Sequence, residues 1–345
     1  MLITLPLVLF IVMTEVSIGS VTVLVLLDWR NEVKRGFLVS YALIYLGLTY
    51  LTYLFQQNFS TPQLLSLYPQ LDQHWVGYQS LPLLLFFLLM IPYNLLLWFD
   101  KRAGVDGGMK EMPKDSSLNS AEIQDVPRPA RPAPRISVIR VLRLLSGVLT
   151  VLAGLTTLFV MAMIYRPLGG MGIGGILTVA SFFAASLALG GVLTAMWLGH
   201  WYLVTPALSE KPLQFATTLV LLGVLAQVVF ALSAVAMPAH SSTTAQQPSA
   251  TPIVSTPTST PAPNKNGTSQ VKPPSSVPTV TPLSTDAITW VRVLVSFVIP
   301  LVLGGLAWKL IRDRSFQSAT GMLYLVVVCT LAGEAMARGL FLVGL

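Results

Sequence analysis

Four acidic or basic residues of this sequence lie well inside long apolar stretches, where a charged side chain is costly. Glu15 lies in the first stretch, Arg292 in the seventh, and both Glu334 and Arg338 lie in the eighth. Each would cost about 2.5–3.5 kcal/mol at the centre of a bilayer, so each needs a chemical reason. Glu334 and Arg338 are four residues apart and share one face of a helix, with the acid on the favourable N-terminal side.

These side chains predict either a functional polar pocket or an internal ion pair. A pocket inside a helical bundle could bind a quinone ring, and a carboxylate in it could accept or donate the protons of the quinone. In the alternative interpretation, Glu334 and Arg338 only neutralise each other. Glu15 has no partner close in the sequence, and we therefore favour a functional role for it.

A histidine among aromatic residues forms a second candidate site. His200 lies in the segment Trp-Leu-Gly-His-Trp-Tyr, residues 197–202, at the end of the fifth apolar stretch. Its imidazole could hydrogen-bond a quinone carbonyl or relay protons. The segment is also typical of the belt that Trp and Tyr form at the membrane–water boundary. We favour the belt for the aromatic residues and keep His200 as a candidate.

The cysteine and histidine counts restrict the cofactors that the chain could hold. Cys329 is the only cysteine, and there are three histidines. Four-cysteine iron–sulfur sites and the haem attachment motif are therefore excluded, and little remains for a bis-histidine haem. We expect no haem or iron–sulfur cluster on this chain, so that any redox centre it serves lies on another chain.

The composition places these residues in a membrane. Of the 345 residues, 54% are hydrophobic and only 10% are charged, whereas about 25% are charged in a typical soluble domain. A soluble enzyme is excluded. A membrane-spanning helix needs about 20 mostly apolar residues, and eight stretches meet that requirement. They are residues 3–27, 37–56, 80–99, 142–165, 173–199, 213–237, 288–310 and 319–343.

We therefore predict an all-α integral membrane protein, whose eight transmembrane helices form two four-helix bundles. Residues 1–100 contain the first three helices, residues 137–237 the next three, and residues 287–345 the last two. Residues 101–136 are charged and Pro-rich, which predicts a flexible cytoplasmic loop. Residues 238–286 are rich in Ser, Thr and Pro, which predicts a disordered linker on the outer side.

The distribution of basic residues predicts the orientation. The odd-numbered connections carry 16 Lys and Arg residues, whereas the even-numbered connections carry three. Since positive loops stay in the cytoplasm, both termini should lie outside the cell's inner (plasma) membrane. The net charge of +7 is concentrated beside apolar segments. It therefore indicates contact with anionic membrane lipid and not with nucleic acid.

Four patches of the sequence carry a family resemblance. The first apolar stretch begins Leu-Pro-Leu-Val-Leu-Phe at residue 5 and reaches Gly19, and the last contains Gly-Glu-Ala-Met-Ala-Arg-Gly-Leu-Phe at residues 333–341. Trp-Val-Arg at 290–292 opens the seventh stretch, and the fifth contains Phe-Phe followed by Gly-Gly at 190–191. Together they resemble the membrane-anchor subunits of dimethyl sulfoxide reductase-type molybdoenzymes, a DmsC-like family related to NrfD-type anchors.

The resemblance implies partners and a substrate. Members of that family anchor a molybdopterin catalytic subunit and a ferredoxin-like iron–sulfur subunit, oxidise menaquinol for them, and hold no cofactor of their own. Two positions of the family's quinol site differ in this chain. The family has a histidine-containing turn after the second helix, where this chain has Gln-Gln-Asn-Phe-Ser at residues 56–60. The family also has an acidic residue near the start of the third helix, where this chain has Gln-Ser-Leu-Pro at residues 79–82 and no acid.

The sequence thus predicts the quinone-interacting anchor subunit of a respiratory oxidoreductase, which passes electrons between quinol and an iron–sulfur partner. We expect menaquinone or ubiquinone to bind near Glu15, Glu334, Arg338 and Arg292, with His200 as a further candidate. Glu15 or Glu334 would handle protons, and Arg338 would be the electrostatic partner. The alternatives are a transporter or ion-translocating protein and a scaffold subunit without a site. Against a transporter, no Gly- or Pro-interrupted helix pair recurs in two inverted halves.

Overall fold

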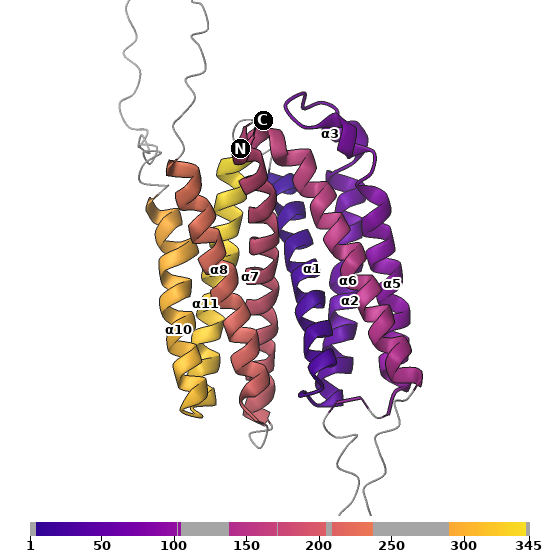
Figure 1. The fold of residues 1–345 in the computed structure, drawn as a ribbon, viewed down its shortest axis with the longest axis vertical. Helices are drawn as coiled ribbons and strands as arrows, with labels where there is room; N and C mark the ends of the chain where they lie inside the picture. The colour runs from indigo at the N-terminus through magenta and orange to yellow at the C-terminus, as the bar shows by residue number, and fades with distance from the viewer. Residues whose placement is uncertain are drawn as a thin grey trace, which may run out of the picture.

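A computed structural model describes six segments of the chain (Figure 1). They are residues 5–101, 103–104, 138–170, 172–204, 209–236 and 290–342. The predicted outer linker, and the predicted cytoplasmic loop beyond Gly104, lie outside the described residues.

The described segments contain eight helices that are long and apolar enough to cross a membrane, which confirms the predicted all-α multi-span class. Seven of them are α1 (Leu5–Arg30), α2 (Arg35–Phe59), α5 (Ser80–Phe99), α6 (Val138–Tyr165), α7 (Ile173–Val204), α8 (Lys211–Ala236) and α11 (Phe316–Phe341). The other span begins at Trp290, passes through the π-helical segment η3 (Leu294–Val298) and continues as α10 (Ile299–Arg312). Three short elements that the sequence did not predict lie in the connections: α3 (Pro62–Leu65), α4 (Gln73–Val76) and η2 (Arg166–Gly169).

The eight spans form two closed four-helix groups. In the first group α1 packs on α2, α2 on α5, α5 on α6, and α6 on α1. In the second group α7 packs on α8, α8 on α10, α10 on α11, and α11 on α7. The groups meet mainly along α1 and α7, with smaller contacts of α1 with α11 and of α6 with α7 (Figure 1). The predicted division into two groups of four therefore describes how the helices pack.

Helix α1 is the central helix of the molecule. In its most hydrophobic stretch 83% of the residues are buried, against 28–50% in the corresponding stretches of the other spans. The other helices expose large side chains such as Leu43, Leu88 and Leu152 on the outside, as lipid-facing helices do. Side chains of α1 therefore meet protein on nearly every side, which is where a polar residue in a membrane protein belongs.

The α1–α7 contact depends on glycines. A Cβ atom on Gly19 would collide with the carbonyl of Ser186, and one on Gly190 would collide with the backbone of Gly19. The absence of side chains at this crossing lets the two backbones approach closely, as small residues do at helix contacts in membranes.

The two ends of the helix assembly differ. The end at which α1 begins and α11 finishes also carries α3, and we call it the terminal end (Figure 1). The opposite end, where α1 and α5 finish and α6 begins, is called the far end.

Candidate functional site

Three of the predicted site residues contact one another at the boundary between the two groups. Arg338 of α11 donates from Nη2 to Oε1 of Glu15 on α1 at 2.5 Å. Its Nε lies 2.8 Å from Oε1 of Glu334, one turn earlier on α11. Gln227 of α8 donates from Nε2 to the other Glu334 oxygen at 2.8 Å. All four side chains are at most 9% exposed, and we call them the central cluster.

Helix α7 covers the central cluster. The guanidinium carbon of Arg338 lies 3.8 Å from the centre of the Phe182 ring, a cation–π contact. Ser186, one turn further along α7, donates its hydroxyl to the backbone carbonyl of Glu15 at 2.9 Å. The close crossing at Gly19 and Gly190 is one turn beyond, so the small residues bring α7 near enough for both contacts.

The seventh span adds a second arginine and an irregular backbone. Arg292 is partly buried and lies within electrostatic range of Glu334 and Arg338. The π-helical segment begins two residues later, and π-helical turns often occur at functional sites. Its Ser296 lies against α11 so closely that a Cβ on Gly333 would collide with it.

Several polar atoms in and beside the central cluster have no hydrogen-bond partner. Two carboxylates share Arg338, and Oε2 of Glu15 is buried without a hydrogen-bond partner. Nε of Arg292 and Oγ of Ser296 are also buried and unpartnered. Groups of this kind can bind a proton or a small polar ligand, because an unsatisfied buried polar atom costs about 1–3 kcal/mol until it finds a partner.

A small pocket lies at the terminal end of the first group, between the end of α2 and the start of α5. Its volume is about 210 Å³, below the roughly 300–1,000 Å³ that enclose a whole drug-sized ligand. Amides and hydroxyls dominate its lining, which consists of Gln56, Gln57, Ser60, Thr61, Pro62, Gln63, Gln79 and Ser80. Gln79 and Ser60 hydrogen-bond each other, whereas Oε1 of Gln56 is buried without a partner.

This pocket joins the two sequence segments in which the chain differs from the family it resembles. Residues 56–60 and residues 79–82 are separated by α3 and α4, and the fold returns them to the same place. Amide groups can donate and accept hydrogen bonds but do not titrate near neutral pH. The pocket can therefore hold the carbonyl oxygens of a ring, while proton exchange needs another group.

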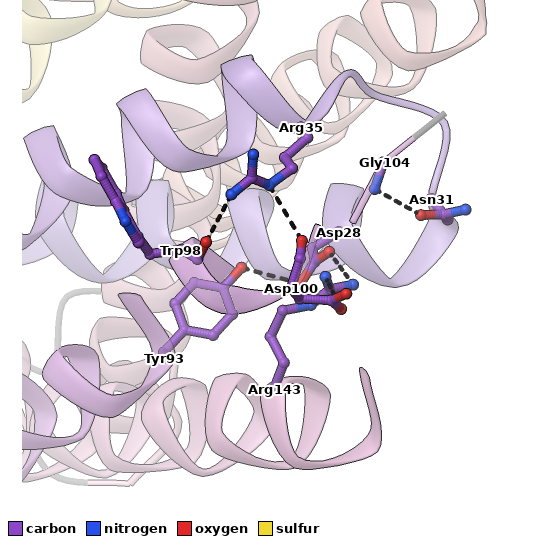
Figure 2. A network of polar contacts seen from close by, with 8 residues as sticks. All are labelled: Asp28, Asn31, Arg35, Tyr93, Trp98, Asp100, Gly104 and Arg143. Carbon is purple, nitrogen blue, oxygen red and sulfur yellow. Dashed lines mark hydrogen bonds and ion pairs between the residues drawn. The ribbon is translucent and has the colours of Figure 1, made fainter. Parts of the chain in front are cut away.

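A second ion-paired network lies at the far end of the first group (Figure 2). Arg143 of α6 contacts Oδ1 of Asp28 at 2.9 Å and Oδ2 of Asp100 at 2.7 Å. The hydroxyl of Tyr93 donates to Asp28 at 3.3 Å. Arg143, Asp28 and Tyr93 are fully buried and Asp100 is 3% exposed. We call these four residues the far-end network.

Neighbouring contacts hold this network in place. Arg35, at the start of α2, donates to the backbone carbonyls of Trp98 and Asp100, at 2.6 and 3.1 Å. Gly104 adopts a left-handed conformation and donates its N–H to the Asn31 side chain at 3.1 Å. A Cβ on Gly104 would collide with the backbone beside Arg35, so the segment after α5 packs tightly on the first connection.

The sequence missed the far-end network because its charged residues lie at the ends of the predicted stretches or just beyond them. The stretches 3–27 and 80–99 left Asp28 and Asp100 outside the membrane, and Arg143 was counted among the charges of a cytoplasmic loop. In the structure α1 runs to Arg30 and α6 begins at Val138, so Arg143 is fully buried in a helix. The signal was the run Arg143, Ser146, Gly147, Thr150, which places polar and small residues on one helical face.

The structure does not bring His200 to the central cluster. It is exposed near the far end of α7, while the cluster lies toward the terminal end. The neighbouring Trp201 and Trp197 pack edge-on or tilted against Phe37 and Tyr41 of α2, at ring-centre distances of 6.0 and 5.5 Å. Tertiary packing between α2 and α7 therefore involves the aromatic residues of this segment.

The fold defines an all-α, multi-span membrane protein with two four-helix groups and a charged site between them. No family model matches the chain, and comparison with curated proteins and with solved structures also finds no match. Within the described segments, no three His, Cys, Asp or Glu side chains gather in a way that could hold a metal ion.

Proposed function

We propose that this chain is the quinone-interacting membrane-anchor subunit of a respiratory oxidoreductase of the molybdoenzyme type. In this role it exchanges electrons between a membrane quinol and a ferredoxin-like iron–sulfur subunit, which serves a molybdopterin catalytic subunit. We place it in the plasma membrane, with the terminal end outside and the far end in the cytoplasm.

One observation carries the proposal: all four patches of the family resemblance meet at the central cluster. The first patch ends at Gly19, one turn from Glu15, and the last contains Glu334 and Arg338. The fifth-helix patch provides the ring over Arg338 and the glycine against Gly19, and the seventh provides Arg292. Chance matches between apolar helices would be scattered over the fold, whereas these converge on one buried site.

The proposal assigns different parts of the chemistry to the two polar sites of the terminal half. The pocket between α2 and α5 receives the quinone head group, whose two carbonyl oxygens accept hydrogen bonds from amides such as Gln56 and Gln79. The central cluster is a separate buried site in which Glu15 or Glu334 can hold a proton, with Arg338 as their electrostatic partner, and the two protons of the quinone are not routed through it. Arg292 contributes positive charge at the edge of the cluster.

The transporter alternative receives less support from the backbone. Transporters with a site at the membrane midplane commonly use discontinuous helices at related positions. Here α5 and the seventh span are each the third span of their group, and both contain a proline, Pro92 and Pro300. Each is nevertheless continuous over the described residues, from Ser80 to Phe99 and from Trp290 to Arg312.

Purification of the tagged full-length protein in a mild detergent tests the proposal. Mass spectrometry should identify a co-eluting iron–sulfur subunit and a molybdopterin subunit, and solvent extraction should recover about one quinone per chain. Gln79→Leu should lower the recovered quinone at least fivefold. Asn58→Leu, which removes an exposed amide just outside the pocket, should not. A chain that elutes alone and without quinone would contradict the proposal.

A further inference from the structure

The buried faces of α2 and α6 are unusually polar for helices inside a membrane protein. From Val138 to Thr157 every buried residue of α6 is polar or glycine: Arg143, Ser146, Gly147, Thr150, Gly154 and Thr157. From Leu43 to Phe59 every buried residue of α2 is polar: Tyr45, Thr49, Thr52 and Gln56. The first stripe occupies the far half of the first group and the second stripe occupies its terminal half.

The two stripes overlap in height along α1. Gly147 packs against Val25, and Gly154 packs against Ile18, so Thr150 lies between these levels. Ser17 of α1 shares a 2.6 Å hydrogen bond with Thr52 of α2. Asp28 and Ser17 are 11 residues apart on α1, which corresponds to about 16 Å along the helix axis. Polar groups therefore occur at successive levels from the far-end network, past the middle of the bundle, to Gln56 and the pocket, while the hydroxyl of Tyr45 turns to Thr194 of α7 at 2.9 Å.

Most hydroxyls of the stripes also bond to their own helices. Thr150 and Thr52, for example, each donate to the carbonyl four residues earlier, a bond that by itself satisfies a buried threonine donor. Their oxygens still have a free acceptor site. Two further atoms have no partner at all: Oγ of Ser146, near the far end, and Oε1 of Gln56, at the pocket, each at least 91% buried.

The second four-helix group provides an internal comparison. Over the far half of α8 the fully buried residues are Leu213, Ala216, Thr217, Val220 and Val224, of which only Thr217 is polar. The far half of α11 buries Ala319, Thr320, Leu323, Val326 and Val327, of which only Thr320 is polar. These two faces thus each bury one polar side chain among apolar ones, whereas the α6 and α2 stripes bury no apolar side chain.

We propose that the first four-helix group encloses a water-accessible seam that carries protons between the cytoplasm and the pocket at the terminal end. The far-end network is its cytoplasmic entrance, with Asp28 as the proton-exchanging group, and the stripes of α6 and α2 line it. The proton-carrying role rests on the proposed function, because the pocket is where the quinone would react.

Oxidation of one hydroquinone to quinone breaks its two O–H bonds, releasing two protons and two electrons. The electrons leave to the iron–sulfur partner subunit, and the protons leave along the seam toward Asp28 and the cytoplasm. Quinone reduction uses the same route in the opposite direction, with the iron–sulfur subunit as the reductant.

Cysteine labelling tests the seam without any need for quinone turnover. In a Cys329→Ser background, Thr150→Cys places a thiol on the α6 stripe, 12 residues after α6 begins at Val138. Val224→Cys places one on the dry face of α8, 13 residues after that helix begins at Lys211. N-ethylmaleimide reacts with the thiolate, which forms only where water reaches the sulfur. We expect the Thr150→Cys protein to react at least tenfold faster, and equal rates would overturn the inference.

A second measurement tests proton transport in the purified complex. In inverted proteoliposomes, where the cytoplasmic face is outside, a water-soluble naphthoquinol should drive acidification of the external medium, with a soluble one-electron acceptor supplied to reoxidise the iron–sulfur subunit. Asp28→Asn should slow acidification and turnover together by at least tenfold, without changing the KM for quinol. Glu32→Gln, at a partly exposed acid of the same end that pairs with Arg30, should leave both unchanged.

The two measurements separate failure of the inference from failure of the proposed function. Quinol could drive turnover while Asp28→Asn changes neither the turnover rate nor the side of the membrane that is acidified. The proton route is then refuted, and the proposed function stands. If the wild-type complex does not oxidise quinol, the proposed function fails and with it the proton-carrying role. In that case the labelling ratio alone decides whether the seam exists.

Discussion

Removal of Arg143 should strongly destabilise the protein, because within the described segments its guanidinium is the only cation that forms an ion pair with the buried Asp28. The two groups are 2.9 Å apart and both side chains are 0% exposed. In an Arg143→Met protein, Asp28 would keep only the neutral Tyr93 hydroxyl as a hydrogen-bond donor. Breaking a buried ion pair by removing one partner typically costs about 3–5 kcal/mol, which is the loss of unfolding free energy that we expect.

Titration with SDS in mixed micelles, followed by tryptophan fluorescence and circular dichroism, would measure this loss. The matched control is Arg140→Met, which removes an exposed arginine one turn earlier on the same helix. An exposed charge contributes about 0–1 kcal/mol, so the control should unfold close to the wild type.

A combined variant tests whether the unpaired charge is the cause. Asp28→Asn and Asp100→Asn, added to Arg143→Met, remove the carboxylates together with their cation. Since no buried charge of the network remains, the triple variant should recover at least half of the lost stability. A triple variant less stable than Arg143→Met alone would refute the reasoning, as would an Arg143→Met protein that unfolds together with the Arg140→Met control.

Three further predictions concern packing, the central cluster and orientation. Gly190→Leu should separate the two groups and lower stability by more than the usual 1–3 kcal/mol of overpacking, as measured by the same SDS titration, whereas Gly305→Leu, which meets no atom within 4 Å, should not. Phe182→Leu removes the ring over Arg338 and should cost about 0.5–2 kcal/mol in that assay, and no loss would contradict a stabilising cation–π contact. Green fluorescent protein inserted within residues 101–136 should fluoresce, as expected for a cytoplasmic loop, and alkaline phosphatase inserted there should be inactive; the reverse result would invert the proposed orientation.

The helices could be predicted from the sequence because each span is a long apolar run. Residues 80–99 were predicted and α5 runs from Ser80 to Phe99, and the other spans begin and end within a few residues of the structure. The sequence did not predict which charges at the ends of these stretches are buried. Arg143 is the clearest case, since a basic residue beside a Pro-rich segment is typical of a loop until its partners are known.

The central cluster could be predicted only in part. Glu334 and Arg338 are four residues apart, so helical geometry alone predicted their contact. The pairing of Glu15 with Arg338 joins positions 323 residues apart. Gln227, which donates to Glu334, lies on a third helix. Such contacts depend on which helices pack together, and hydrophobicity does not distinguish one apolar helix from another as a neighbour.

The pairing of Glu15 with Arg338 also has a consequence for how the protein is made. Helix α1 leaves the ribosome before α11, so Glu15 enters the bilayer well before its cation exists. At about 5–20 residues per second, synthesis of the intervening 323 residues takes roughly 16–65 s. During that time the first helix has a carboxyl group in the membrane without its arginine. Assembly of the two groups around α1 is therefore completed only when the last helix inserts, and a chain truncated before α11 should be a substrate for membrane proteases.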